Sequence, residues 1–146
     1  MKLTPETAAR LLTILLRLIG GVMLLATLAV AMPTKWMAWT HTQIGLGDLP
    51  RGPIVEYLTR SLSALYAVHG AVLLMLAMDV RRYRAVIAGV GGLHAAFGLT
   101  TVWIDWVAGM PMWWTANEGG PVAVVGGVIF WLARQIGEPR NDSPDR

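Results

Sequence analysis

The stretch that decides the fold is residues 85–109, which read AVIAGVGGLHAAFGLTTVWIDWVAG. It is apolar along most of its length, and its one charged residue is Asp105. A helix needs about 20 predominantly apolar residues to cross the ~30 Å hydrocarbon layer of a bilayer. The stretch therefore predicts a transmembrane helix. Asp105 is a candidate functional residue, because a charged group inside a span is costly and is seldom kept without a role.

Three other stretches have the same character, at residues 11–32, 54–78 and 119–136. Hydrophobic residues make up 55% of the 146 residues, charged residues only 14%, and the mean hydropathy is +0.52. These values lie outside the range of ordinary soluble domains. The sequence predicts an all-α integral membrane protein, a four-helix bundle that forms one domain over residues 1–137 in contact with the lipid bilayer. The polar tail, residues 138–146, is predicted to be disordered.

Basic residues predict the orientation of the four spans. Nine of the twelve Lys and Arg residues fall in the N-terminal region, in the loop between the second and third spans, or in the C-terminal tail: Lys2, Arg10, Arg17, Arg81, Arg82, Arg84, Arg134, Arg140 and Arg146. The positive-inside rule then places both termini in the cytoplasm. Because these charges lie at span ends, the net charge of +3 does not indicate nucleic-acid binding. The absence of cysteine excludes disulfides and thiolate metal sites.

The first span has a second interpretation. Basic residues, an apolar run and the sequence Ala29-Val30-Ala31 also resemble a secretory signal with its cleavage site. The apolar run is long for a signal core, so we expect an uncleaved helix.

The connections on the outer side are the longer ones. Residues 33–53, which include Trp36 and Trp39, predict a short interfacial helix followed by turns. Residues 109–121 predict a turn into the last span, with Asn117 or Thr115 as the N-cap.

Polar residues form one seam on each of the two central spans. At 100° per residue, Arg60 and Ser63 share a face of the second span, and Thr101 and Asp105 share a face of the third. A short loop makes these spans antiparallel neighbours, so Arg60 and Asp105 reach similar depths near the outer surface. Glu118 begins the last span on the same side. We therefore predict a cluster of Arg60, Asp105 and Glu118.

Two interpretations of this cluster remain open. It is either an ion-paired clasp that fixes the order of the helices, or a pocket in which Arg60 binds an anionic or carbonyl group. Trp113 and Trp114 fit either an outer aromatic belt or the walls of such a pocket. The candidate ligand-binding residues are Arg60, Asp105, Glu118, Ser63, Thr101, Trp113 and Trp114.

His69 and His94 lie near the middle of neighbouring spans, where a haem b would be sought. His69 falls about 180° around its helix from Arg60, away from the seam that should meet His94. We therefore favour two hydrogen-bonded core histidines over a bis-histidine haem. No metal site is predicted, because no carboxylate supports the histidines at that depth.

Glycine is frequent in the last two spans, where small residues allow helices to approach closely. Gly120 and Gly127 are seven residues apart and share a face, which we expect to include Ala123. We expect these glycines to serve helix packing. A phosphate-binding loop is excluded, because no lysine or strand accompanies them.

Two segments carry a resemblance to a known family. They are LTRSLSALYAVHGAVLL at residues 58–74, and IDWVAGMPMWW at 104–114 followed by Glu118-Gly119-Gly120-Pro121. In residues 54–136 the chain resembles the DoxX-like group of small bacterial four-helix membrane proteins, in which an arginine one turn into a span precedes small residues and a glycine, as Arg60 precedes Gly70. The resemblance implies a four-helix bundle in the bacterial inner membrane and a tie to quinone or thiol redox chemistry. The lack of cysteine argues against the thiol branch.

Two functions follow as hypotheses. The first is a binding or accessory protein that packs with itself or with a larger membrane complex and holds a lipid or quinone-like molecule near the outer face. The alternative is a small membrane oxidoreductase or proton-transfer enzyme, in which Arg60 orients the substrate and Asp105 or Glu118 takes the proton.

Overall fold

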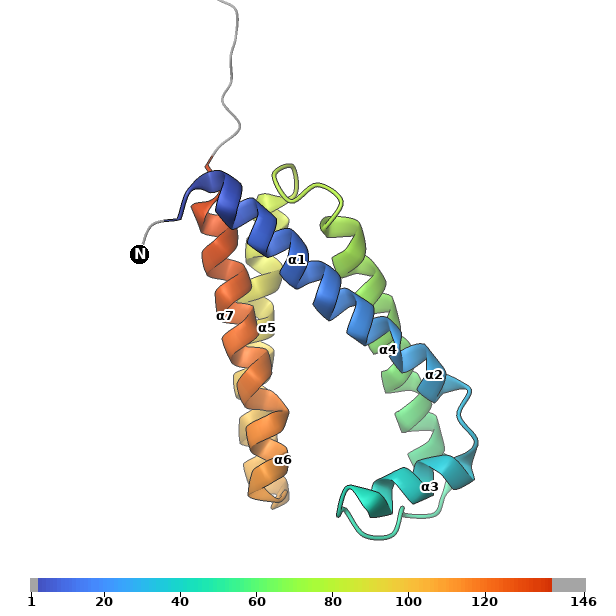
Figure 1. Ribbon diagram of the computed structural model, residues 1–146. Coiled ribbons are helices and arrows are strands. Elements are labelled where there is room, and N and C mark those ends of the chain that lie inside the picture. The colour runs from blue at the N-terminus through green and yellow to red at the C-terminus, as the bar shows by residue number, and fades with distance from the viewer. Residues whose placement is uncertain (1–2, 138–146) are drawn as a thin grey trace, which may run out of the picture. The chain divides into compact units, whose positions relative to one another are not determined.

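The computed structural model describes residues 3–137, and helices account for most of them (Figure 1). In chain order the helices are α1 (Pro5–Leu24), α2 (Ala26–Val30), α3 (Thr34–Gln43), α4 (Pro53–Leu76), α5 (Arg84–Ala108), α6 (Met112–Asn117) and α7 (Gly119–Gln135). They fall into two compact units. Residues 3–15 and 76–137 belong to the first unit, and Leu16–Met75 form the second, so that α1 is shared between them.

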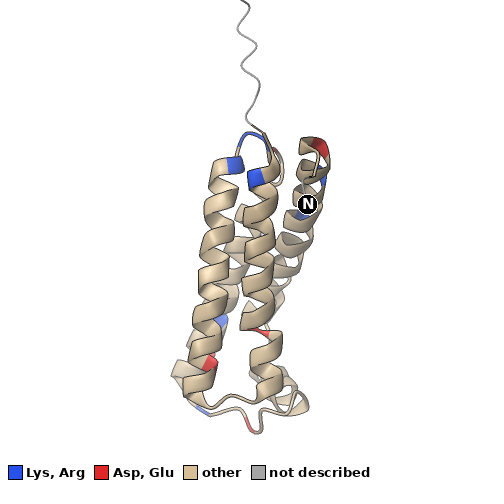
Figure 2. Ribbon diagram, turned by 90° about the vertical axis from the view of Figure 1, so that its left-hand side faces the viewer, with Lys and Arg blue, Asp and Glu red and all other residues tan. Residues whose placement is uncertain are grey.

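The first unit is built on the antiparallel pair α5 and α7, which lie side by side (Figures 1 and 2). α5 ends at Ala108, and the next residue, Gly109, adopts a left-handed conformation with φ of 68°. This closes the helix, because the N–H of Met110 donates to the carbonyl of Asp105 at 2.9 Å. The short helix α6 then leads directly into α7.

Basic residues gather at the opposite end of the α5 and α7 pair, where α5 begins and α7 ends (Figure 2). The guanidinium of Arg84 donates to the carbonyl of Ile136 at 3.5 Å and so ties these two helix ends together. Arg81, in the preceding loop, forms an ion pair of 3.7 Å with Glu6 in the first turn of α1. Both side chains are exposed, so this ion pair contributes little stability.

The second unit contains the rest of α1 together with α2, α3 and α4. α1 and α4 touch through glycine, since a Cβ on Gly20 would lie 2.8 Å from the carbonyl oxygen of Gly70. α3 carries Trp36 and Trp39, which are 65% and 66% exposed. The short helix predicted within residues 33–53 is thus present as α3.

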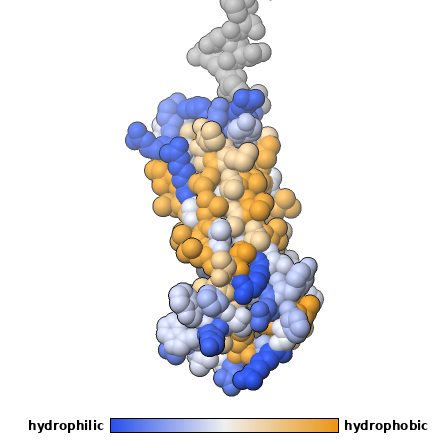
Figure 3. Space-filling view, turned by 90° about the vertical axis from the view of Figure 1, so that its right-hand side faces the viewer, coloured by the Kyte–Doolittle hydropathy of each residue, from blue (hydrophilic) through white to orange (hydrophobic). Residues whose placement is uncertain are grey.

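Four helical segments are long and apolar enough to cross a membrane: Pro5–Val30, Pro53–Leu76, Arg84–Ala108 and Met112–Gln135. On the face seen in Figure 3, apolar residues cover the middle of the helices and hydrophilic residues cover the ends. The prediction of four apolar spans in an all-α protein is confirmed. The first span begins earlier than the predicted residue 11, because the helix extends to Pro5 through polar residues. The predicted disordered tail, 138–146, lies outside the described residues.

The turn predicted for residues 109–121 is partly wrong. Residues Met112–Asn117 form the short helix α6, and the N-cap of α7 is Glu118 rather than Asn117 or Thr115. The side-chain amide of Asn117 donates instead to the carbonyl of Trp113 at 2.6 Å, within α6.

Candidate functional site

One face of α5 carries both close-packed glycines and an acid. Gly91, Gly98 and Asp105 are seven residues apart, so they share a face, and all three are buried. A Cβ on Gly91 would lie 2.5 Å from the backbone nitrogen of Phe130, and a Cβ on Gly98 would lie 2.3 Å from that of Ala123. Real Cβ atoms do not approach a backbone so closely, so the two helices can touch here only because these residues are glycine. The face that carries Asp105 is therefore the face that packs against α7.

The matching glycines of α7 are Gly119 and Gly126. A Cβ on Gly119 would lie 2.7 Å from the carbonyl oxygen of Gly98, and a Cβ on Gly126 would lie 2.3 Å from the nitrogen of Ala95. The predicted packing face of Gly120, Ala123 and Gly127 is right for Ala123 but wrong for the two glycines. Ala123 packs against α5 together with Gly119 and Gly126, which directly precede Gly120 and Gly127 in the sequence.

The same distinction recurs in each Gly-Gly doublet of the chain, which are Gly20-Gly21, Gly91-Gly92, Gly119-Gly120 and Gly126-Gly127. In every doublet the first glycine is buried against another helix. A Cβ on the second would meet no described atom within 4 Å, except at Gly92, where the nearest is a ring carbon of Phe130 at 4.0 Å. Adjacent glycines thus have different roles, since one residue turns a helix by 100°.

Asp105 is the ionisable residue on the face of α5 that packs against α7. Its side chain is buried, with the residue only 5% exposed. Among the described residues, no group donates a hydrogen bond to its buried Oδ2. The backbone carbonyl of Asp105 accepts a hydrogen bond from the N–H of Met110, so only the side chain lacks a donor. A buried carboxyl oxygen without a donor costs about 1–3 kcal/mol, and more if it is charged, so this position favours an additional donor.

Glu118 lies at the same end of the helix pair, at the start of α7. Its carboxylate accepts a hydrogen bond from the indole Nε1–H of Trp114. The ring of Trp114 meets that of Trp113 edge to face, with centroids 5.6 Å apart and planes at 75°. This geometry suits the aromatic quadrupoles. Glu118, Trp113 and Trp114 therefore form one connected group around α6.

The two hydroxyl groups predicted to belong to the site bond to their own helices. Thr101 donates to the carbonyl of Phe97 at 3.0 Å, and Ser63 donates to that of Thr59 at 2.8 Å. Each hydroxyl proton is used in this way, while the hydroxyl oxygens remain available as acceptors.

Arg60 lies in the second unit and binds the end of α2. Its guanidinium donates to the carbonyl oxygen of Val30 and, at 3.0 Å, to that of Met32. It also lies 4.0 Å from the carboxylate of Glu56, one turn earlier on α4. The last carbonyls of a helix have no partner within the helix, so Arg60 satisfies groups that would otherwise be costly inside a membrane.

These contacts of Arg60 were not predicted, although a signal for them exists. Met32 precedes Pro33, and a residue before proline is disfavoured in a helix. The first span therefore has to end near this point and leave its carbonyls without donors. A long cationic side chain at the start of the next span is well suited to reach them.

The predicted site residues thus divide between the two units. Arg60 and Ser63 belong to Leu16–Met75, whereas Thr101, Asp105, Trp113, Trp114 and Glu118 belong to the other unit. The structure connects Trp113, Trp114 and Glu118 directly. It places Thr101 and Asp105 one turn apart on α5.

The histidines also fall in different units. The Nδ1–H of His94 donates to the carbonyl of Val90 at 2.8 Å, one turn earlier on α5. This agrees with the interpretation of His94 as a hydrogen-bonded residue. Within residues 3–137 there is no group of three or more His, Asp or Glu side chains that could hold a metal ion.

No family model matches this chain, and no curated protein sequence or solved structure matches it.

Proposed function

We propose that this protein is an integral membrane protein of the binding or accessory type. Its four spans form one bundle in the bacterial inner membrane, with both termini in the cytoplasm. The distribution of Lys and Arg supports this orientation. The resemblance of residues 54–136 to the DoxX-like group supports the bundle.

The bound molecule is amphipathic and carries a hydroxyl group, as a quinol or a hydroxylated lipid does. The observation that carries this proposal is the buried Oδ2 of Asp105, which has no donor among the described residues. A hydroxyl from the ligand would donate to this oxygen. Trp113 and Trp114 would contact its apolar part, and Glu118 and Thr101 would offer further acceptors. Arg60 and Ser63 have a structural role in this proposal, since Arg60 already binds the carbonyls of Val30 and Met32.

The test is native mass spectrometry of the protein extracted gently from its own membrane. We expect wild-type protein to retain an adduct of lipid or quinol mass, and the Asp105→Leu variant to lose it. Asp48→Asn is the matched control, because Asp48 is an exposed acid in the loop before α4. Retention of the same adduct by Asp105→Leu would refute the assignment.

The accessory part of the proposal rests on the open side of α7. Gly120 and Gly127 are free of contacts from described residues, and Val124, between them, is 67% exposed. Small residues on one stripe suit close packing of another span. We expect this stripe to meet a second copy or a larger membrane complex, and Gly127→Leu to lower the assembly mass in the same experiment.

A second candidate function is a small oxidoreductase or proton-transfer enzyme. Two carboxyl groups at one end of the α5 and α7 pair favour it, since one could accept a proton from a bound quinol while the other positions the molecule. Turnover of an added quinol, with an added quinone analogue as electron acceptor, that is abolished in Asp105→Asn would select this alternative. Binding without turnover would select the accessory function.

A further inference from the structure

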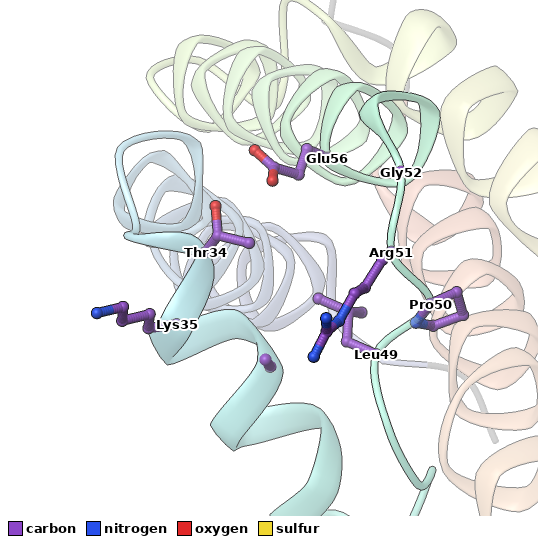
Figure 4. Close-up of a pocket in the computed structure, with 8 residues that line it drawn as sticks. Thr34, Lys35, Leu49, Pro50, Arg51, Gly52 and Glu56 are labelled. Carbon is purple, nitrogen blue, oxygen red and sulfur yellow. The ribbon is translucent and has the colours of Figure 1, made fainter.

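A groove of about 380 Å³ lies between the first turn of α3 and the segment that enters α4 (Figure 4). All of its lining residues belong to the unit Leu16–Met75. Thr34 and Lys35 line it from α3, Arg51 and Gly52 line it from the loop, and Glu56 lines it from α4. In Figure 4 the guanidinium of Arg51 extends from the loop toward α3, whereas the side chain of Lys35 points away from Arg51.

The basic residues of this groove lie apart from most other basic residues of the chain. Between Arg17 and Arg60 there are two basic residues, Lys35 and Arg51, and both line the groove. They are sixteen residues apart in the sequence, and the folding of the connection places both in the lining of one groove. The positive-inside rule accounts for the nine basic residues at the cytoplasmic span ends but not for these two.

Neither cation is neutralised by the described part of the chain. The ion pairs among residues 3–137 are Arg60 with Glu56 and Arg81 with Glu6. Glu56, the acid that lines the groove, is therefore paired with Arg60, whose guanidinium lies 4.0 Å from its carboxylate. The groove keeps the positive charge of Lys35 and Arg51 and attracts an anion.

The segments that flank the groove have features of the lipid headgroup layer. α4 is a candidate span that begins at Pro53, directly after Arg51 and Gly52. On the other side α3 exposes Trp36 and Trp39, and tryptophan on a short helix next to a span is typical of the membrane interface. Phosphate groups are the anions of this layer. Arginine binds them through paired N–H donors, and lysine binds them as a point charge.

We propose that this groove binds a phosphate group, supplied by an anionic lipid, through Lys35 and Arg51. The guanidinium of Arg51 donates to the phosphate oxygens, and the Thr34 hydroxyl is a further donor. Lys35 adds a second positive charge from α3 when its flexible side chain turns toward the groove. This site is separate from the one proposed at Asp105, and it does not depend on that proposal.

The proposal is tested with purified full-length protein in a neutral detergent. Dioleoyl-phosphatidylglycerol or dioleoyl-phosphatidylcholine is added in steps, and bound lipids are counted by native mass spectrometry. We expect tighter binding of phosphatidylglycerol, and about 30-fold weaker binding in the double variant Lys35→Gln/Arg51→Gln. Arg81→Gln/Arg82→Gln, which removes two exposed basic residues from another loop, is the matched control and should bind as wild type does.

A second arm uses inorganic phosphate in place of lipid. We expect no protection against thermal unfolding from millimolar phosphate, since a lipid also binds through its chains. Protection that disappears in the double variant would assign the phosphate to a soluble ligand. The proposal is overturned if both lipids bind wild type equally, or if Lys35→Gln/Arg51→Gln binds phosphatidylglycerol as tightly as wild type. The charge-keeping variant Lys35→Arg/Arg51→Lys should retain most of the binding.

Discussion

The ionisable side chains of Arg60 and Asp105, each near one end of a central apolar helix, have different surroundings. Arg60 of α4 donates to the carbonyls of Val30 and Met32 and has Glu56 beside it. Asp105 of α5 is more deeply buried, and its Oδ2 has no donor among the described residues. The first arrangement completes the backbone hydrogen bonding of a helix end. The second leaves an acceptor that the described chain does not fill, and this difference separates a structural charge from a candidate binding group.

The helix contacts around these two residues differ as well. α5 and α7 approach through four glycines on facing stripes, with Asp105 one heptad beyond Gly98. In the second unit, α1 and α4 approach through Gly20 and Gly70. A tight seam with an acid at its end holds that acid rigidly, because close-packed backbones cannot move apart without losing their contacts. Rigid placement is what a binding group requires.

The largest effect is expected from adding a methyl group to the α5 and α7 seam. Gly126→Ala would place a Cβ 2.3 Å from the backbone nitrogen of Ala95, and neither backbone can move aside locally. We expect a loss of more than about 3 kcal/mol in the free energy of unfolding, measured by unfolding in mixed micelles with increasing dodecyl sulfate. Gly89→Ala, on α5, is the control and should be neutral, because its Cβ would meet no described atom within 4 Å. Equal effects of the two substitutions would show that the seam is not close-packed.

A smaller loss is expected from Arg60→Met, which retains the apolar stem and removes the donors. The carbonyls of Val30 and Met32 would then lack a partner inside the membrane, at a cost of about 3 kcal/mol. The same unfolding titration measures it. Ser63→Ala, one turn further on α4, removes a hydroxyl that bonds to its own helix and should change little. If Arg60→Met left the free energy of unfolding unchanged, the structural role of Arg60 would be refuted. Arg60 would then again be a candidate ligand-binding residue.

The four long apolar helices and the short helix α3 could be predicted from the sequence, because long apolar stretches and a tryptophan-bearing connection each have a direct physical meaning. The rotation of each helix about its own axis, which decides the face that packs against a neighbour, could not be predicted. Gly119 and Gly126 have the same seven-residue spacing as Gly120 and Gly127, so spacing alone cannot select the pair that meets α5. The choice depends on the packing of the whole seam.

The candidate site was predictable to a similar extent. A charge within an apolar stretch singled out Arg60 and Asp105 in the sequence. The structure gives Arg60 backbone partners and buries Asp105. The partners of Arg60 are backbone carbonyls near the end of α2. Pro33 indicates that the helix ends near them, but it does not indicate which side chain reaches them. Side-chain patterns predict which ionisable groups are exceptional, but they do not predict the backbone atoms that satisfy them.

Trp114→Phe is expected to have an effect of about 1 kcal/mol on stability. It keeps an aromatic ring against Trp113 but removes the indole N–H that Glu118 accepts. The double variant Trp114→Phe/Glu118→Gln should be no less stable than Trp114→Phe, since the hydrogen bond is already lost. Additive losses in this cycle would mean that Glu118 has a second partner that matters for folding.

The smallest effect on folding is expected from Asp105→Leu, and here the comparison with Arg60 is sharpest. Replacing a buried polar group that lacks a partner by an apolar one of similar size removes an unmet acceptor and breaks no described side-chain hydrogen bond. We expect the protein stripped of small molecules to unfold at the same dodecyl sulfate fraction as wild type or at a higher one. A marked loss of stability would mean that Asp105 has a donor in the folded membrane protein and is as structural as Arg60. Unchanged stability together with loss of the bound molecule would separate the two residues, because a group that serves binding can be removed without harm to the fold.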